Sequence, residues 1–362
     1  MVVQPTQIAA SAETNVASRR WPAEWEPQNA VWFSWPHKKK TWPRHFNPIP
    51  AAFASMVHAV AEFVDVKVLA SAGKHATAAK KLLGISKPIE LIDIETNDTW
   101  IRDFGPTFVH ERGKLVGIDW NYNAWGGKHP PWDDDAAAAR QICNLASVVC
   151  ESSKLTLEGG AIEGDGLGRM LTTPICVQTA NRNRGWSRDR ISREFHKRLG
   201  VTEIVWIDGG GLDGDDTDGH IDQLARFVTP TDLVVAVSSN PNDVNAVGLS
   251  RNFAQLSAWA EQTTPTITVH ELSTPPPREI EGQRVPESYC NFIMIGDRGI
   301  VVPTFGNRKS DSRALGLLRE LRPESKVVGI DAKDFIWGRG AWHCASQQQP
   351  AAAEGVFYKG IS

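Results

Sequence analysis

Residues 50–70 read PAAFASMVHAVAEFVDVKVLA, and their pattern decides the fold class. From position 53 to position 64 the apolar side chains recur at steps of three and four residues, which predicts an amphipathic helix. These side chains are Phe53, Met56, Val57, Val60 and Val64. Residues 66–70 follow at once as a β-branched, apolar run typical of a strand. A helix that leads directly into a buried strand indicates a protein that mixes the two elements.

On both sides of this segment, the alternation of strand and helix returns about every fifty to seventy residues. Strands are predicted at 30–35, 89–94, 107–110, 115–118, 170–173, 203–207, 224–228, 233–237, 292–295, 299–303 and 326–330. Helices are predicted at 74–83, 132–147, 187–199, 244–262 and 311–321. Because the two are interleaved, the fold class is α/β or α+β. We expect one domain over residues 21–362 after a flexible lead-in at residues 1–20.

The composition is that of an ordinary globular chain and excludes several classes of protein. The 362 residues include 39 basic and 42 acidic side chains, so no nucleic acid and no anionic membrane is expected as a partner. No apolar run is long enough to cross a bilayer, and residues 1–20 do not read as a signal peptide. The five cysteines are too few and too scattered for a disulfide framework. We expect a cytoplasmic protein, and a homo-oligomer is compatible with the sequence.

Four stretches place glycine beside ionisable residues, which is costly unless the backbone must approach another group closely. They are 97–106 (NDTWIRDFGP), 157–160 (LEGG), 209–222 (GGGLDGDDTDGHID) and 338–348 (GRGAWHCASQQ). These stretches are the candidates for a functional site.

In the third stretch, His220 and Asp222 share one face if the chain is extended from residue 220 to residue 228. A histidine beside a carboxylate is a candidate general acid/base pair, although a solvated acidic loop has the same composition. A calcium-binding EF-hand that starts at Asp213 fails, since Asp218 stands where glycine is required and Leu224 where the final glutamate is required. The acids are also crowded into one short segment, so no metal centre is predicted.

Cys344, in the fourth stretch, is the candidate nucleophile. Among the cysteines, it alone is flanked by small and polar residues, and Gly338 and Gly340 precede it closely. The cysteines at positions 143, 150, 176 and 290 lie in helical or apolar contexts typical of buried thiols. A single reactive cysteine with a histidine and carboxylates far away in the sequence is a pattern of thiol catalysis.

The four carboxylates of these stretches, Asp98, Asp103, Glu158 and Asp222, exceed what a Cys–His hydrolase of esters or amides requires. Nearby anions favour the neutral thiol, so this surplus suits a substrate that brings positive charge. A guanidinium is planar, offers only donors and pairs with carboxylates through two parallel hydrogen bonds. The residues therefore predict cysteine-dependent chemistry on a guanidino carbon.

The same stretches resemble motifs of the agmatine deiminases, in the group of guanidino-modifying enzymes that includes the bacterial peptidylarginine deiminase type. The matching segments run in order over 21–25, 97–109, 123–127, 157–160, 181–183, 217–222, 288–292, 301–303 and 343–348. The resemblance implies a five-bladed, pseudo-symmetric β/α propeller (pentein-type) in a single domain. It also implies that Cys344 is the nucleophile, His220 the acid/base, Asp103 and Asp222 the guanidinium carboxylates, and Glu158 a supporting catalytic carboxylate.

The reaction implied is the hydrolysis of agmatine to N-carbamoylputrescine and ammonia through a covalent thiouronium on Cys344, with no cofactor and no metal. The partner is thus a small cationic guanidino substrate. The alternatives are a deiminase of arginine, peptidyl-arginine or another guanidino compound, and an amidinotransferase that admits an amine instead of water.

Five further residues have predicted places. Trp100 and Asp98 are expected to line the substrate site, with Trp100 as a wall or as a cation–π partner of the guanidinium. Arg102 is expected to be structural and to pair with a neighbouring carboxylate, and His343 to face away from Cys344 if the chain is extended. Arg339 replaces a glycine of the family pattern and is expected to point to the surface. If it points inward, it can receive a carboxylate and shift the preference toward arginine.

Overall fold

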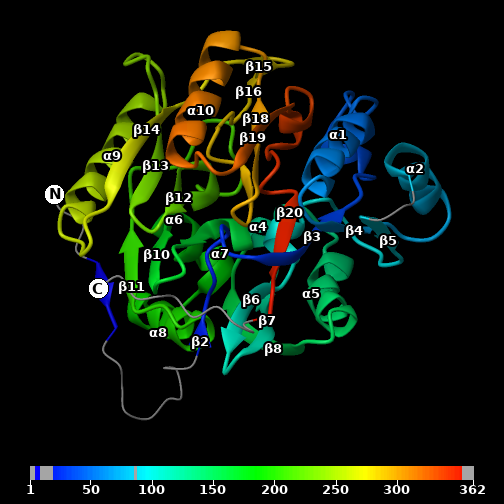
Figure 1. Cartoon of the computed structure of the whole chain (residues 1–362), viewed down its shortest axis with the longest axis horizontal. Coiled ribbons are helices and arrows are strands. Elements are labelled where there is room, and N and C mark those ends of the chain that lie inside the picture. Colours follow the sequence, from blue (N-terminus) through cyan, green and yellow to red (C-terminus); the bar gives the residue numbers. More distant parts are fainter. Residues whose placement is uncertain (1–4, 9–18, 85–87, 353–362) are drawn as a thin grey trace.

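The computed structural model describes residues 5–8, 19–84 and 88–352, and within them the strands form five sheets and one two-stranded ribbon (Figure 1). The strands are β1 (Thr6–Gln7), β2 (Arg19–Arg20), β3 (Gln28–Ser34), β4 (Asp65–Leu69), β5 (Ile89–Ile92), β6 (Thr107–Glu111), β7 (Lys114–Asn121), β8 (Val149–Thr156), β9 (Ile162–Gly164), β10 (Arg169–Thr172), β11 (Glu203–Trp206), β12 (Ala225–Thr229), β13 (Asp232–Val237), β14 (Thr268–Ser273), β15 (Glu279–Ile280), β16 (Gln283–Arg284), β17 (Ile293–Ile295), β18 (Gly299–Thr304), β19 (Lys326–Asp331) and β20 (Ser346–Pro350). The sheets have the orders β20-β3-β4-β5, β2-β6-β7-β8, β1-β11-β10-β9, β12-β13-β14 and β17-β18-β19, and β15 pairs with β16.

Helices connect and cover these sheets (Figure 1). The α-helices are α1 (Ile49–Ala61), α2 (Lys74–Leu83), α3 (Ile101–Phe104), α4 (Ala124–Gly127), α5 (Asp133–Leu145), α6 (Pro174–Val177), α7 (Ala180–Asn183), α8 (Arg188–Leu199), α9 (Ala246–Ala260) and α10 (Arg308–Leu321). The 3-10 turns are η2 (Lys39–Thr41), η3 (Gly159–Ala161), η4 (Ile221–Gln223) and η5 (Phe335–Gly338). The mixed α/β class predicted from the sequence is confirmed.

One unit recurs in all five sheets: two parallel strands joined by a helix. The units are β3-α1-β4, β7-α5-β8, β10-α8-β11, β13-α9-β14 and β18-α10-β19. The segment at residues 50–70 is the helix and second strand of the first unit. Its predicted apolar stripe is buried, with Phe53, Met56, Val57 and Val60 at 0% exposure. Parallel strands joined by a helix bury both faces of the sheet, which accounts for the apolar runs in the sequence.

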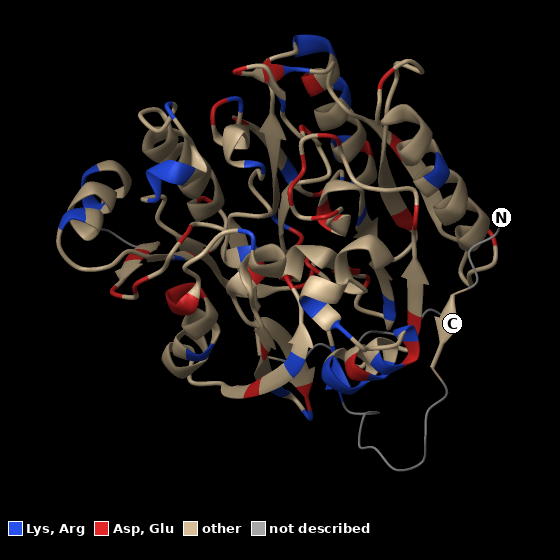
Figure 2. Cartoon of the chain, turned by 180° about the vertical axis from the view of Figure 1, so that it is seen from behind, with Lys and Arg blue, Asp and Glu red and all other residues tan. Residues whose placement is uncertain are grey.

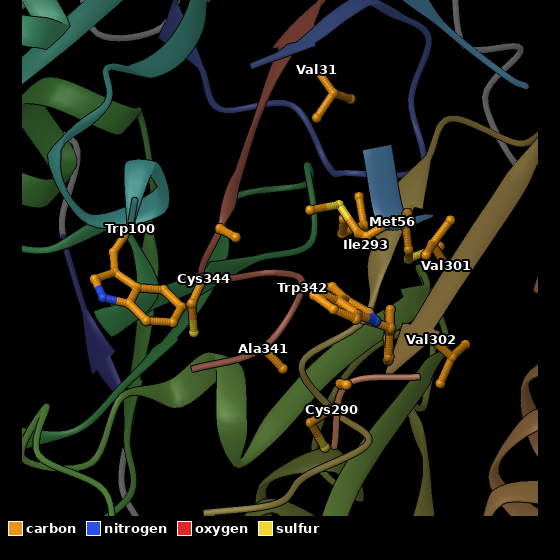
Figure 3. Packing of buried hydrophobic residues seen from close by; sticks show 14 of the residues in the cluster. Val31, Met56, Trp100, Cys290, Ile293, Val301, Val302, Ala341, Trp342 and Cys344 are labelled. Atoms are coloured by element: carbon orange, nitrogen blue, oxygen red, sulfur yellow. The ribbon is translucent and has the colours of Figure 1, made fainter. Parts of the chain in front are cut away.

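The hydrophobic core extends to the nucleophile candidate. Trp342 is fully buried and packs on the aromatic ring of Phe335, with the ring centroids 4.9 Å apart. Figure 3 shows the Trp342 side chain directed toward Val301 and Ile293, while Cys344 and Trp100 lie together on the other side of this segment. Trp342 therefore anchors the turn in the core, and Cys344, two residues further on, presents the thiol to the site.

Two short strands fall within the predicted lead-in of residues 1–20. Thr6–Gln7 pairs with β11 and Arg19–Arg20 pairs with β6, so these residues belong to sheets. The predicted flexibility of residues 1–4 and 9–18 concerns positions outside the described residues. Among the helices that the structure describes, none has the length and apolar character that crossing a membrane requires.

Candidate functional site

Cys344 lies in the turn that leads into β20, and its side chain is only 3% exposed. Asn291 Nδ2 donates to Cys344 Sγ over 3.1 Å, and Asn291 Oδ1 accepts from the backbone N–H groups of Ala341 and Cys344 over 3.2 and 3.3 Å. One amide thus holds both the thiol and the backbone of its turn. Asn291 was not singled out from the sequence, although it lies in the 288–292 segment of the resemblance.

The environment of Cys344 favours the neutral thiol. Burial raises the pKa of Cys344 well above its ordinary value, and the charges of Asp222 and Asp103 raise it further. The hydrogen bond from Asn291 acts in the opposite direction and is outweighed. Cys344 Sγ lies 3.6 Å from Asp222 Oδ2. A thiolate in this position requires a further positive charge.

Asp103 is positioned by α3 and is 4% exposed. Its Oδ1 accepts from the Gly160 backbone N–H over 3.0 Å, and its Oδ2 accepts from Trp125 Nε1 over 3.0 Å. Burial raises the pKa of Asp103 to about 6; the nearby His220 lowers it, while Asp222 and Glu158 add to the rise. The carboxylate is fixed in orientation and is poised to accept a cation.

His220 is fully buried and lies between two carboxylates. Its Nδ1 is 3.7 Å from Asp103 Oδ1, and its Nε2 is 3.5 Å from Glu158 Oε2. Neither ring nitrogen has a hydrogen-bond partner among the described residues. Although burial acts to lower it, the pKa of His220 is raised well above its usual range, chiefly by the charge of Asp103. The imidazole is held in its charged form.

Asp222 lies in η4, and its side chain is fully buried. Its Oδ2 accepts from His343 Nδ1 over 2.7 Å, and its Oδ1 has no hydrogen-bond partner among the described residues. Burial acts to raise the pKa of Asp222, but the hydrogen bond and charge of His343 outweigh it and the pKa is lowered. Asp222 therefore keeps its charge and has one oxygen available for a ligand.

The strand predicted at residues 224–228 is β12, which begins at Ala225. The condition that the chain is extended from residue 220 is not met, because the 3-10 turn η4 follows His220. A tight turn, rather than alternation along a strand, brings His220 and Asp222 to the same site. In the fourth stretch, residues 342–345 form a turn and not an extended segment, and Nδ1 of His343 contacts Asp222.

Glu158 lies immediately before η3 and is fully buried. Arg182 Nε lies 2.9 Å from each of the two carboxylate oxygens of Glu158, and Arg182 Nη1 donates to Asp218 over 2.7 Å. Burial acts to raise the pKa of Glu158, but contacts with His220 and Arg182 outweigh it and the pKa is lowered. Arg182 belongs to the 181–183 segment of the resemblance, yet its pairing with Glu158 had no signal in the sequence.

Gly160 marks the point at which the predicted residues converge. A Cβ atom at this position would lie 2.6 Å from His220 Nδ1, 2.9 Å from Asp103 Oδ1 and 3.1 Å from Asp222 Oδ2. The prediction that glycine stands where backbone meets ionisable groups is confirmed here. Figure 2 shows acidic segments on loops in the middle of the view, where the sheets come together.

A pocket of about 370 Å³ leads from the surface to Cys344, Asp103 and Trp100. Trp100 is 5% exposed, and Gly338 and Gly340 let the backbone lie against it, since a Cβ at either position would come within 2.8 Å of its ring. Asp98 also lines the pocket and accepts from Thr41 Oγ1 over 2.8 Å, with Lys38 Nζ at 3.4 Å. Burial raises the pKa of Asp98. Trp100 is a wall of the pocket, as predicted.

Arg102 and Arg339 have different places. Arg102 is buried in α3, and its Nη1 donates to the Gln348 amide over 2.6 Å, while the carboxylate of Glu24 lies 3.9 Å from its Nη2. The surface orientation predicted for Arg339 is wrong. Arg339 is half-buried at the rim of the pocket, and its Nη1 donates to the carbonyl oxygens of Gly214 and Arg284 over 3.1 and 2.7 Å.

Comparison with known proteins agrees with this geometry. Residues 20–350 match the profile of the Porphyromonas-type peptidyl-arginine deiminases. The chain belongs to this family. It is 34% identical over 356 residues to the agmatine deiminase of Pseudomonas aeruginosa (strain LESB58), covering 92% of this chain and 95% of the relative.

Solved structures give the same result for this member of the deiminase family. An agmatine deiminase of Enterococcus faecalis superposes with a TM-score of 0.87 at 28% identity, covering 95% of this chain and 99% of that one. A substrate-bound agmatine deiminase variant of C. jejuni superposes with a TM-score of 0.85 at 29% identity, covering 92% and 97%. The family predicted from the motifs is confirmed, and the protein is a hydrolytic, amidine-modifying enzyme.

Proposed function

We propose that this protein deiminates agmatine, releasing ammonia and N-carbamoylputrescine. One observation carries the proposal: Asp103, Asp222 and His220 converge around Gly160, and the Cys344 thiol lies 3.6 Å from Asp222 where the pocket reaches Asp103 and Cys344. Relatives of similar length that cover most of this chain are agmatine deiminases. A guanidinium bound between Asp103 and Asp222 supplies the positive charge that the buried thiol of Cys344 lacks.

The first half-reaction forms a covalent intermediate. Binding of the cation lowers the pKa of Cys344, and its thiolate attacks the guanidino carbon. His220 donates a proton from Nδ1, the nitrogen nearer Asp103, to the departing amino group. Ammonia leaves, and a thiouronium remains bonded to Sγ.

The second half-reaction regenerates the free enzyme. Neutral His220 removes a proton from water, the hydroxide attacks the same carbon, and the C–S bond breaks to release the ureido product. The intermediate keeps its positive charge, so Asp103 and Asp222 stabilise it throughout. Glu158 acts on His220 from the Nε2 side and holds the ring in place.

Arginine is a second candidate substrate, because Arg339 lies at the rim of the pocket. Its Nη1 donates to two carbonyl oxygens and its Nη2 to Gln283, and a guanidinium has further N–H donors that can meet a carboxylate. Measuring kcat/KM for agmatine, arginine and an arginyl peptide decides between them. We expect agmatine to be preferred. Preference for arginine, reversed in Arg339→Gly, would assign the carboxylate to Arg339.

The mechanism is tested with the nucleophile. Cys344→Ala is expected to abolish ammonia release, and a haloacetamidine is expected to add its mass to the wild-type chain but not to this variant. Near-normal turnover by Cys344→Ala would contradict the mechanism. Transfer of the amidino group to glycine or ornithine would instead indicate an amidinotransferase.

The five sheets support a finer description of the fold. We propose that they are the five blades of a β/α propeller, with each strand–helix–strand unit as one repeat, within a single catalytic domain from residue 21 onward. This arrangement places the site where the sheets meet. Five equivalent rotations that superpose the units would test it.

A further inference from the structure

Behind the imidazole of His220 lie two side chains that are also metal-ligand types, Glu158 and Cys176. Each of the three residues offers one ligand atom, and these atoms all lie within 4.8 Å of one another. Glu158, Cys176 and His220 all have 0% exposure. The proposed mechanism uses the carboxylate and the imidazole but assigns no step to the Cys176 thiol.

The spacing of the ligand atoms fits a tetrahedral metal. Glu158 Oε2 lies 3.5 Å from His220 Nε2 and 3.7 Å from Cys176 Sγ. Zinc bonds of about 2.0–2.1 Å to nitrogen and oxygen and about 2.3 Å to sulfur place such atoms about 3.4 and 3.6 Å apart at the tetrahedral angle. Two of the three distances between ligand atoms therefore match a tetrahedral zinc site, and the third, between His220 and Cys176, is at most 4.8 Å.

The ligand atoms are also available. His220 is fully buried, yet neither of its nitrogens has a hydrogen-bond partner in the described parts of the chain. Glu158 Oε2 accepts from Arg182 Nε over 2.9 Å and from the Cys176 thiol over 3.7 Å, and loss of the thiol proton on metal binding frees the lone pair that faces Sγ. The Arg182 charge is shared with Asp218 through a 2.7 Å ion pair, so it does not by itself neutralise Glu158.

We propose that Glu158, Cys176 and His220 form a site for Zn²⁺, and that the ion inhibits the enzyme by occupying Nε2 of its acid/base. A thiolate, an imidazole and a carboxylate are a donor set that suits zinc, whereas calcium and magnesium prefer oxygen alone. The three side chains leave the fourth position of a tetrahedral ion to a further ligand. Binding releases the thiol proton of Cys176 and the Nε2 proton of His220 to solvent.

The inhibition has a specific cause. An imidazole that holds zinc through Nε2 carries its one remaining proton on Nδ1. Giving this proton to the leaving amine would create an imidazolate, so the first half-reaction stops. This effect on turnover rests on the proposed function, whereas the binding of the ion does not.

Cobalt(II) provides a readout of binding that needs no substrate. Titration of Co²⁺ into the full chain, freed of metal with a chelator, is expected to give a thiolate-to-cobalt absorption band that saturates at one equivalent and that Zn²⁺ removes. Cys176→Ala is expected to lose the band. Cys344→Ala and Cys150→Ala, which keep the three ligands, are expected to retain it.

Each outcome decides one part of the proposal. The proposed site is overturned if the wild type gives no cobalt band. It is also overturned if Cys344→Ala loses the band while Cys176→Ala keeps it. If Cys176→Ala does not fold, the cobalt titration of Cys344→Ala decides alone whether the band comes from the proposed site. One equivalent of Zn²⁺ is expected to stop ammonia release by the wild type but not by Cys176→Ala, each compared with its own zinc-free rate. A band without inhibition would overturn the effect on catalysis and leave the site standing.

Discussion

Gly160 is the residue whose side chain the site cannot accept. In Gly160→Ala the new Cβ would stand 2.6 Å from His220 Nδ1 and 2.9 Å from Asp103 Oδ1, so both groups must move. A displacement of this order costs about 100-fold in catalysis, and we expect kcat/KM for the guanidino substrate to fall by at least that factor. Steady-state ammonia release measures it.

The matched control is Gly316→Ala. Gly316 lies in α10 with nothing within 4 Å of the added Cβ, so this change should leave kcat/KM unaltered. It should also stabilise the helix by about 0.5–1 kcal/mol, since alanine loses less backbone entropy. Wild-type turnover by Gly160→Ala would mean that the groups around it do not hold the substrate.

His343 gives the second prediction at this scale. Its Nδ1 donates to Asp222 Oδ2 over 2.7 Å, while its Nε2 lies 3.3 Å from Glu24 Oε2. The side-chain nitrogen of asparagine takes the place of Nδ1, whereas leucine has no donor. We expect His343→Asn to keep most of kcat/KM and His343→Leu to lose at least about tenfold, because an unmade hydrogen bond to a charged group costs about 1.5–3 kcal/mol. Equal activity of the two variants would contradict this role.

The ionisable residues of the site could be predicted from the sequence, whereas the side chains that hydrogen-bond to them could not. Cys344, His220, Asp103, Asp222 and Glu158 stand beside glycines in polar stretches, and such patterns can be read locally. Their partners cannot, since Asn291 reaches Cys344 across 53 residues and Trp125 reaches Asp103 across 22. A contact between distant positions leaves no periodicity in either segment.

At the scale of elements, β20 is stabilised by hydrogen bonds of its own polar side chains, whose sequence is typical of a solvated loop. Gln349 Oε1 accepts from Trp32 Nε1 over 2.9 Å, and Gln348 Oε1 accepts from Arg102 Nη1 over 2.6 Å. Every residue from Ser346 to Pro350 is buried. The strand was not predicted, because its buried side chains are polar and lack the apolar pattern of a strand. Hydrogen bonds to distant residues stabilise them instead. β8 and β14 were missed for a related reason, since both carry mainly polar or half-exposed residues.

Gln348→Met tests how much the hydrogen bond between Gln348 and Arg102 stabilises the fold. The substitution keeps the volume but leaves a buried guanidinium donor of Arg102 without its acceptor. We expect the free energy of unfolding to fall by about 1–3 kcal/mol. Chemical denaturation of the wild type and the variant measures it, with Gln283→Met at the exposed ribbon as the comparison. Equal stability of Gln348→Met and the wild type would show that Arg102 finds another acceptor.

At the scale of the whole molecule, a buried ionic cluster links strands of two sheets with the turn between β2 and β3. Arg226, in β12, donates to Glu163 over 2.9 Å and also pairs with Glu24. Burial raises the pKa of Glu163 from 4.5 to about 7; Arg226 lowers it and Glu24 raises it further. Burial acts to raise the pKa of Glu24 as well, but Arg226 and His343 outweigh it and the pKa falls to about 2.

These shifts have opposite consequences for stability. Glu163 binds a proton in the folded protein that the unfolded chain releases, so its contribution is present below pH 4.5 and is lost as the pH rises through about 7. Glu24 stabilises the fold above pH 4.5 and loses that contribution as the pH falls toward about 2. We expect the unfolding free energy of Glu163→Gln to decline less than that of the wild type between about pH 5 and 7.5. A parallel decline would show that Glu163 does not titrate in this range.

The pairing of β20 with β3 has a consequence for when the enzyme becomes reactive. Trp32 and Gln349, which are hydrogen-bonded across this pair, are 317 residues apart in the chain, and contacts of such separation form slowly. Cys344 stands two residues before β20, so the turn that carries its thiol is in place only after this strand docks on β3. A molecule in which this sheet is open has no ordered turn to hold the Cys344 thiol beside Asn291 and Asp222. Docking of β20 onto β3 and assembly of the site are thus coupled steps of folding.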